Sequence, residues 1–231
     1  MLYDEKTPED FLMKCARCCK LGMGYPAWMN NQGGMNYMLR HYQPEGMTIY
    51  DARAWCLGGC LESSPGCFQP LHYNGKTYMV PGGAAPTCGT GIHFTGLPKL
   101  LELVLTNGED KRTGIQVFAP HNHKLDTFED VWDVWMMYMR ELLDVANKIN
   151  NIQMDVWRKI NMPVVASMLK PDCFKKGQHI GNEGARYNGG INFESCGTVN
   201  FINSMASLKK NVYDDKKYTL EEMTDAILHN F

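Results

Sequence analysis

The sequence lacks both an excess of one charge and a long apolar run. Its 231 residues include 23 lysines and arginines against 25 aspartates and glutamates, a formal net charge of −2. Because no basic block stands out, we expect no nucleic-acid partner. No apolar run approaches the roughly 18 residues of a membrane-spanning helix, and residues 1–6 are acidic and polar, unlike a signal peptide. These absences predict a cytoplasmic globular protein that spans no membrane.

Paired metal ligands are also missing, although cysteine is abundant. The nine cysteines are an odd number in a chain that is neither short nor visibly secreted, so reduced thiols fit better than a disulfide framework. Cys15 and Cys18 have the spacing of half a zinc site, but no second cysteine or histidine pair stands at a fitting distance. We therefore expect these thiols to pack in a core and the chain to hold no metal.

Apolar periodicity predicts alternating helices and short buried strands, which is typical of an α/β architecture. The longest pattern begins near Thr127 and continues toward Ile160 with helical spacing. Residues 164–169 are apolar and begin with two valines, which favours a buried strand. Glycine, asparagine and proline predict loops over residues 22–44 and 61–91. Further helices are predicted over residues 8–20, 48–55, 97–106, 171–176, 204–210 and 220–229.

One cysteine stands in a turn built of small residues. The run Gly58-Gly59-Cys60-Leu61-Glu62 places a thiol after paired glycines and a carboxylate two residues beyond it. Glycine lets backbone approach a substrate closely, and a buried carboxylate there would have a raised pKa suited to proton transfer. The motif predicts thiol chemistry at Cys60, although by itself it also fits a buried structural cysteine.

Other blocks accompany this turn in a fixed order: Asp51-Ala52-Arg53, Ser64-Pro65-Gly66, residues 97–108, and Gly184-Ala185-Arg186-Tyr187-Asn188. The order resembles that of the glycyl radical enzymes, in which the cysteine of a G-C-x-E loop becomes a thiyl radical. The resemblance implies that residues 1–231 are an internal, incomplete part of a ten-stranded α/β barrel. The family stores its radical on a glycine in a C-terminal R-V-x-G-[YF] loop, which is absent from this chain. It also implies a radical-SAM activating enzyme that installs this glycyl radical.

The resemblance assigns the thiyl radical to Cys60. A thiyl radical abstracts a hydrogen atom from carbon and later returns it, so the sulfur must face the substrate in a dry pocket. Glu62 is the candidate for proton transfer beside the radical carbon, and Gly59 and Leu61 are candidates for substrate contact next to the sulfur. Cys67, which stands in a second Gly-Cys loop, is the alternative radical site.

The residues after the turn favour one branch of the family. Ser63 stands where diol dehydratases and choline lyases tend to have proline, and residues 66–91 make a longer excursion. With residues 151–158 and 169–181, they resemble the large subunit of benzylsuccinate synthase and its alkylsuccinate relatives. That resemblance implies radical addition of a hydrocarbon, toluene or an alkane, to fumarate, in a homo-oligomer with small iron–sulfur subunits. Cationic candidates for binding fumarate are Lys76, Arg53 and Arg186.

Three alternatives stay open. A dehydratase, a C–N lyase or an arylacetate decarboxylase of the same superfamily would use Cys60 and Glu62, although the long excursion after Pro65 favours fumarate addition. The missing radical-glycine motif instead fits a non-catalytic remnant that is stable only with partner chains. A zinc-binding module is the third and weakest alternative.

Overall fold

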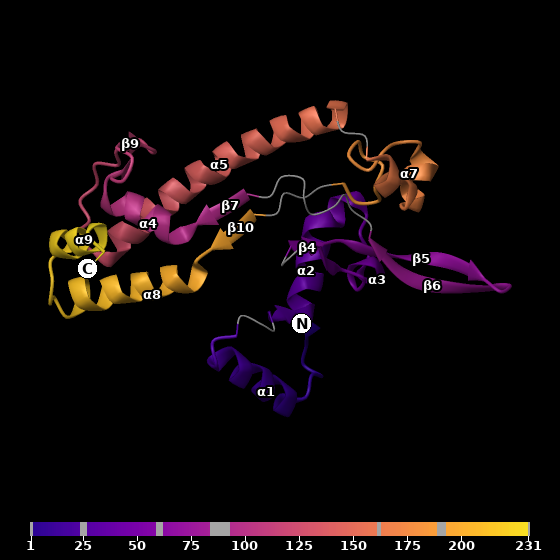
Figure 1. Cartoon of the computed structure of the whole chain (residues 1–231), viewed down its shortest axis with the longest axis horizontal. Coiled ribbons are helices and arrows are strands. Elements are labelled where there is room, and N and C mark those ends of the chain that lie inside the picture. The colour runs from indigo at the N-terminus through magenta and orange to yellow at the C-terminus, as the bar shows by residue number, and fades with distance from the viewer. Residues whose placement is uncertain are drawn as a thin grey trace. The chain divides into compact units, whose positions relative to one another are not determined.

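The chain divides into two units, each with its own core. The computed structural model describes residues 2–23, 27–58, 62–83, 93–160, 163–188 and 193–230. Unit 1 comprises residues 1–91 and 154–192, and unit 2 comprises residues 92–153 and 193–231 (Figure 1). Both units mix helices with two-stranded sheets, as the α/β prediction requires.

Unit 1 begins with two helices and a short parallel pair of strands, β1 (Leu2–Tyr3) with β2 (Met29–Asn30). The first helix begins one residue later than predicted and ends at the predicted residue, Lys20. The second lies inside residues 22–44, where a loop with only short pieces of structure is predicted, and this prediction is wrong. This helix forms because the Asn30 side chain accepts a 2.7 Å hydrogen bond from the Gly33 backbone and caps the helix. The elements that follow β1 are α1 (Glu9–Lys20), β2, α2 (Asn31–Tyr42), the 3-10 turn η1 (Gln43–Glu45) and α3 (Ile49–Ala52).

Three strands, β4 (Glu62–Ser64), β5 (Gly66–Tyr73) and β6 (Lys76–Gly83), lie within residues 61–91, where one long loop is predicted, so this prediction is also wrong for the described residues. The larger pair, β5 with β6, forms a ribbon that closes at Asn74-Gly75. Both turn residues have positive φ, 48° and 72°, as a two-residue hairpin turn demands. The smaller pair is β3 (Cys56–Gly58) with β4. Residues 61 and 84–91 of the predicted loop lie outside the described residues.

The end of unit 1 is helical. Residues 164–168 form helix α6 (Val164–Met168), so the predicted strand is wrong. Val164 and Val165 are 56% and 73% exposed, and the burial that a parallel strand would supply is absent. Helix α7 (Pro171–Lys176) follows as predicted and ends at Gly177, whose φ is 63°. The main core of unit 1 consists of Met38, Tyr42, Met47, Ala52, Trp55, Cys67 and Tyr187.

Unit 2 contains a parallel strand pair, and each strand runs into a helix, as Figure 1 shows. The helices predicted over residues 97–106, 127–160 and 220–229 are confirmed, and the one predicted over 204–210 begins earlier. Leu97, Leu101, Val131, Trp135 and Phe201 belong to the core that these helices share. The elements are β7 (His93–Gly96), α4 (Leu97–Leu105), β8 (Glu109–Asp110), β9 (Ile115–Gln116), α5 (Phe128–Ile160), β10 (Phe193–Cys196), α8 (Thr198–Leu208), the π-helical turn η2 (Lys209–Asp214) and α9 (Leu220–Leu228). Residues 154–160, at the end of α5, belong to unit 1.

No helix among the described residues is long and apolar enough to cross a membrane.

Candidate active site

The predicted radical cysteine stands between two paired strands. Strands β3 and β4 are antiparallel, and Gly58 lies opposite Glu62. Gly59, Cys60 and Leu61 join these two residues and lie outside the described part of the chain, as does the side chain of Glu62. The structure therefore places the attachment points of the Cys60 loop, and the roles of these residues stay predictions.

Just outside this strand pair, the segment that follows β4 contacts the segment that precedes β3. The backbone of Gly66, at the start of β5, touches the carbonyl group of Ala54, which stands two residues before β3. A Cβ atom at position 66 would collide with that carbonyl oxygen. Glycine is required here by this close approach of two backbones.

Asp51 holds the same region together with its carboxylate. Its Oδ1 accepts a hydrogen bond from the Phe68 backbone N–H at 3.2 Å. Its Oδ2 accepts one from the Tyr187 hydroxyl at 2.6 Å and lies 3.5 Å from Nη1 of Arg186. The Asp51 side chain is only 13% exposed, so these contacts act in a region with little water.

The Arg186 guanidinium connects a second carboxylate to this cluster. Its Nε lies 3.3 Å from Oδ2 of Asp172, on helix α7. Nearby, the Asn188 backbone N–H donates to Oε2 of Glu45 at 2.6 Å. The two sequence blocks that begin at Asp51 and at Gly184 are thus in direct contact, although more than a hundred residues separate them.

Cys67 is a core residue of this region. Its side chain is fully buried, and burial raises the pKa of its thiol, an effect that the Gln69 hydrogen bond and the Arg186 charge partly offset. Burial and the hydrogen bond to Asp51 likewise raise the pKa of the Tyr187 hydroxyl. Both groups therefore keep their protons near neutral pH, and the environment of Cys67 is that of a structural thiol.

The predicted cationic residues are spread over different environments. Lys76 is exposed and pairs with Tyr73 at the turn end of the β5–β6 ribbon, opposite the end at which Gly66 pairs with Gly83. Arg53 is exposed as well, and Arg186 already contacts two carboxylates. The role of Lys76 in substrate binding stays a prediction, as do those of Arg53 and Arg186.

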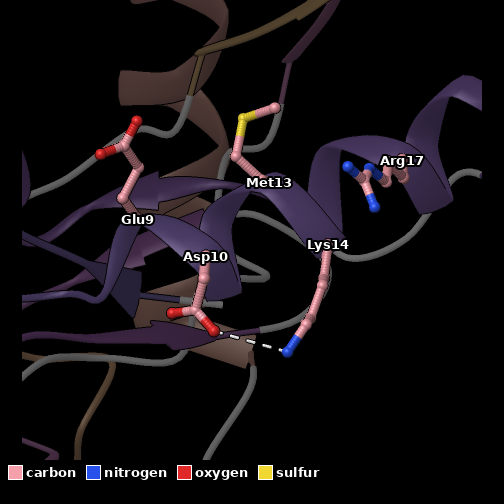
Figure 2. A pocket seen from close by; sticks show the side chains of 5 residues that line it. All are labelled: Glu9, Asp10, Met13, Lys14 and Arg17. Carbon is pink, nitrogen blue, oxygen red and sulfur yellow. Dashed lines mark hydrogen bonds and ion pairs between the residues drawn. The ribbon is translucent and has the colours of Figure 1, made fainter.

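Two surface hollows offer no alternative site. One, of about 410 Å³, lies beside α1, and Figure 2 shows that its side chains come from this single helix, with Lys14 and Asp10 paired at 3.4 Å. The other, of about 250 Å³, lies between α6 and α7 and has no carboxylate, lysine or arginine in its lining. Among the described residues, no group of three histidine, cysteine or acidic side chains could hold a metal ion.

The whole chain, residues 1–231, matches the family model described as pyruvate formate lyase-like. The chain belongs to the pyruvate formate lyase-like family. This membership confirms the resemblance to the glycyl radical enzymes.

Two decarboxylases are among the proteins to which the chain is similar. The chain is 71% identical over its full length to the 4-hydroxyphenylacetate decarboxylase glycyl radical subunit of Clostridium scatologenes. It is 33% identical over its full length to the indoleacetate decarboxylase of Tractidigestivibacter scatoligenes. The chain spans 26% and 24% of the lengths of these two proteins.

A solved structure of the family supports the fold. The structure described as 1,2-propanediol dehydration in Roseburia inulinivorans matches with a TM-score of 0.70 at 22% identity, over 99% of this chain and 26% of that one. The predicted fold class is therefore confirmed: the chain is a mixed α/β part of a glycyl radical enzyme barrel.

These relatives correct the prediction of fumarate addition. The identity to a decarboxylase subunit shows that the predicted similarity to benzylsuccinate synthase is wrong. The predicted hydrocarbon and fumarate substrates are therefore wrong as well. The prediction is wrong because the length of residues 66–91 does not indicate the reaction. Residues 66–83 form the β5–β6 ribbon, which is a structural element and does not specify the chemistry at Cys60.

Sequence reasoning missed the convergence on Asp51. Asp51 and Tyr187 both stood in blocks that identified the family, but their mutual contact needed the fold. The parallel pair β7–β10 also brings His93 and Glu194 to neighbouring register positions, and the sequence had singled out neither. No periodic pattern marks any of these residues, because each contact joins distant segments.

Proposed function

We propose that the chain is an internal segment of the catalytic barrel of a 4-hydroxyphenylacetate decarboxylase, with the radical glycine in a part of the protein outside this chain. The observation that carries the proposal is the 71% identity to a glycyl radical subunit of that name. The relative at 33% identity is named for indoleacetate, which is also an arylacetate. An arylacetate is therefore the proposed substrate class, and the 4-hydroxyphenyl compound is the first choice.

The proton balance of this reaction gives Glu62 a role. An arylacetate anion that loses CO₂ must gain one proton to become a methylarene, whatever the order of the radical steps. Addition of a hydrocarbon to fumarate has no such net requirement. A carboxyl group two residues from the radical cysteine is suited to deliver this proton, and we assign the delivery to Glu62.

Cys60 is the proposed hydrogen carrier. The Cys60 thiyl radical takes one electron from the arylacetate carboxylate, CO₂ leaves as the C–C bond breaks, and Glu62 protonates the resulting Cys60 thiolate. The thiol then gives its hydrogen atom to the arylmethyl carbon radical, which becomes the methyl group, and the thiyl radical is restored. Gly59 and Leu61 are proposed to contact the substrate beside the sulfur. The fully buried position of Cys67, with its raised pKa, favours Cys60 over Cys67 for this step.

Partners follow from the same comparison. The family membership supports a glycyl radical that a radical-SAM enzyme installs. Because the relative is named a subunit, we propose that the full-length protein works with a companion chain.

The test uses the full-length protein that carries this chain, activated without oxygen by its radical-SAM partner. We expect 4-hydroxyphenylacetate to give 4-methylphenol and CO₂ in equal amounts, with weaker turnover of indoleacetate. Toluene with fumarate should give no adduct. A clear glycyl radical signal without decarboxylation of either arylacetate would reject the proposal.

Matched variants separate the residues. Cys60→Ser should abolish turnover while the glycyl radical signal persists, whereas Cys67→Ser should keep turnover. Glu62→Gln should lower kcat by about 10²- to 10⁴-fold, the usual contribution of a positioned proton donor. Equal loss in both cysteine variants, with the radical intact, would contradict the assignment to Cys60.

A further inference from the structure

The segment that bears Cys60 starts and ends at one side chain. From Asp51 the chain runs through β3, residues 59–61 and β4, and returns at Phe68, whose backbone N–H donates to Oδ1 of Asp51 at 3.2 Å. We call residues 52–67 the Cys60 segment. Within this segment, the backbone of Gly66 near one end also contacts the Ala54 carbonyl near the other end.

Donors from separate parts of the chain converge on this carboxylate. Besides the Phe68 N–H, it receives the Tyr187 hydroxyl at 2.6 Å and the Arg186 guanidinium at 3.5 Å. Hydrogen bonds to an ionised carboxylate are roughly twice as strong as those between neutral groups. With 13% exposure, water cannot readily replace a lost donor, so removal of one leaves the carboxylate undersatisfied.

The opposite side of the cluster is also anchored. Arg186 divides its contacts between Asp51 and Asp172, and its side chain is 28% exposed. The Tyr187 ring lies in the main core of unit 1 together with Cys67 and Trp55. Asp51 therefore connects both ends of the Cys60 segment to a packed and charge-paired support.

We propose that Asp51, held by Tyr187 and Arg186, is a positioning residue that fixes the Cys60 segment for hydrogen transfer. Asp51 acts through the backbone on either side of the radical cysteine, and nothing requires it to touch the substrate. The proposal rests on the proposed function, because it assigns the reactive sulfur to Cys60. Its importance follows from geometry, since a shift of about 1 Å in a reacting group can lower a rate 10²-fold.

The test removes one donor and preserves shape. Tyr187→Phe deletes only the hydroxyl that donates to Asp51. Tyr138→Phe is the matched control, because its buried hydroxyl also makes a hydrogen bond, to the Ala119 carbonyl at 2.9 Å, but lies in unit 2. Arg186→Lys is a second variant that keeps the positive charge and loses the planar fork. All three are made in the full-length protein with its companion chain.

The first readout needs no substrate. Amide hydrogen exchange over residues 56–68 should become at least about tenfold faster in Tyr187→Phe and in Arg186→Lys, and stay unchanged in Tyr138→Phe, because local opening is governed by the contacts of that segment. Unchanged exchange over these residues in both Tyr187→Phe and Arg186→Lys would overturn the proposed role of Asp51.

The second readout tests whether the contacts of Asp51 affect turnover. In Tyr187→Phe, kcat should fall by about 10- to 100-fold with KM nearly constant and the glycyl radical yield retained. A merely structural role would lower the radical yield and the folded fraction together and would spare kcat per radical, which would overturn the proposal. If the wild-type protein decarboxylates neither arylacetate, the proposed function fails. The hydrogen-exchange measurement then still tests, independently of turnover, whether Asp51 fixes the Cys60 segment.

Discussion

At the residue scale, Asp110 shows how one carboxylate can organise a turn. It accepts hydrogen bonds from Lys99 Nζ at 2.9 Å, Thr113 Oγ1 at 2.8 Å and the Arg112 backbone at 3.1 Å. These donors, with the hydrogen bond from Lys99 the largest influence, lower the pKa of Asp110 to about 2. The carboxylate is thus stabilised in its ionised form only while unit 2 is folded.

A pH dependence follows from this shift. Because the folded pKa lies below the unfolded one, the stabilisation is fully present above about pH 4 and is lost as the pH falls toward 2. We expect Asp110→Asn to lower the melting temperature of the 231-residue chain at pH 7 and to have a smaller effect near pH 2. Thermal unfolding across this range measures the difference.

Asp144→Asn is the control for that experiment, since it removes one carboxylate from an exposed position on α5. It should change the melting temperature little at either pH. An Asp110→Asn variant whose deficit is as large at pH 2 as at pH 7 would contradict the linkage.

Which single residues matter could be predicted only in part. Glycine and cysteine form a compact local pattern that predicts Cys60, Glu62 and Cys67, and the roles of Cys60 and Glu62 stay predictions. Asp51, Arg186 and Tyr187 stood in recognised blocks, but their joint function depends on a contact across 135 residues or more. The spacing of residues along the chain cannot predict a contact between segments so far apart.

At the scale of the element, helix α2 (Asn31–Tyr42) contains two adjacent glycines with opposite environments. A Cβ at Gly33 would make only ordinary contacts, the nearest at 3.5 Å to Asn30, whereas a Cβ at Gly34 would overlap the indole of Trp55. The second glycine lets the helix pack directly against this buried ring.

The two positions give a matched pair of substitutions. Gly33→Ala should stabilise the chain by up to about 1 kcal/mol, because alanine favours a helix interior. Gly34→Ala should destabilise it by about 1–3 kcal/mol through overpacking. Denaturant unfolding of both variants measures these changes, and equal effects at the two positions would exclude the contact with Trp55 as the cause.

The last helix, α9, offers a further test at this scale. Thr219 and Glu222 form a capping box, in which the Thr219 side chain accepts from the Glu222 N–H and Glu222 accepts from the Thr219 N–H. Thr219→Ala should destabilise the chain by about 1 kcal/mol. Thr224→Ala serves as the control inside the same helix, and its smaller effect is expected because Thr224 caps no terminus.

The elements that were predicted correctly share a clear local signal. The amphipathic α5 and the capped α9 follow from periodicity and capping residues alone. Helix α2 was missed because its glycines resemble a loop until Trp55 is in place, and α6 was missed because a short apolar run fits a strand equally well. The Asn74-Gly75 turn did carry the signal for the β5–β6 ribbon.

At the scale of the whole molecule, the chain exposes an apolar stripe on α5. Three side chains at helical spacing in the unit 2 part of α5 are each at least 45% exposed, namely Val145, Ile149 and Ile152. A continuous exposed stripe of this kind favours association in water. We expect the isolated 231-residue chain to self-associate.

Charge placed in the stripe should weaken this association. Ile152→Lys should shift the sedimentation profile toward the monomer at the same protein concentration. Ile115→Lys is the control, because Ile115 is 59% exposed but lies on β9, outside the stripe. If both variants changed the profile equally, net charge and not the stripe would explain the result.

The parallel pairing of β7 with β10 has a consequence for the timing of synthesis. His93 is partnered with Phe193, so a hundred residues must be made before the first strand meets the second. At translation rates of roughly 5–20 residues per second, β7 waits about 5–20 seconds on the ribosome without its neighbour. A strand with an unpaired edge for that long is a natural ligand for chaperones, and slower translation between these strands would lengthen the exposure.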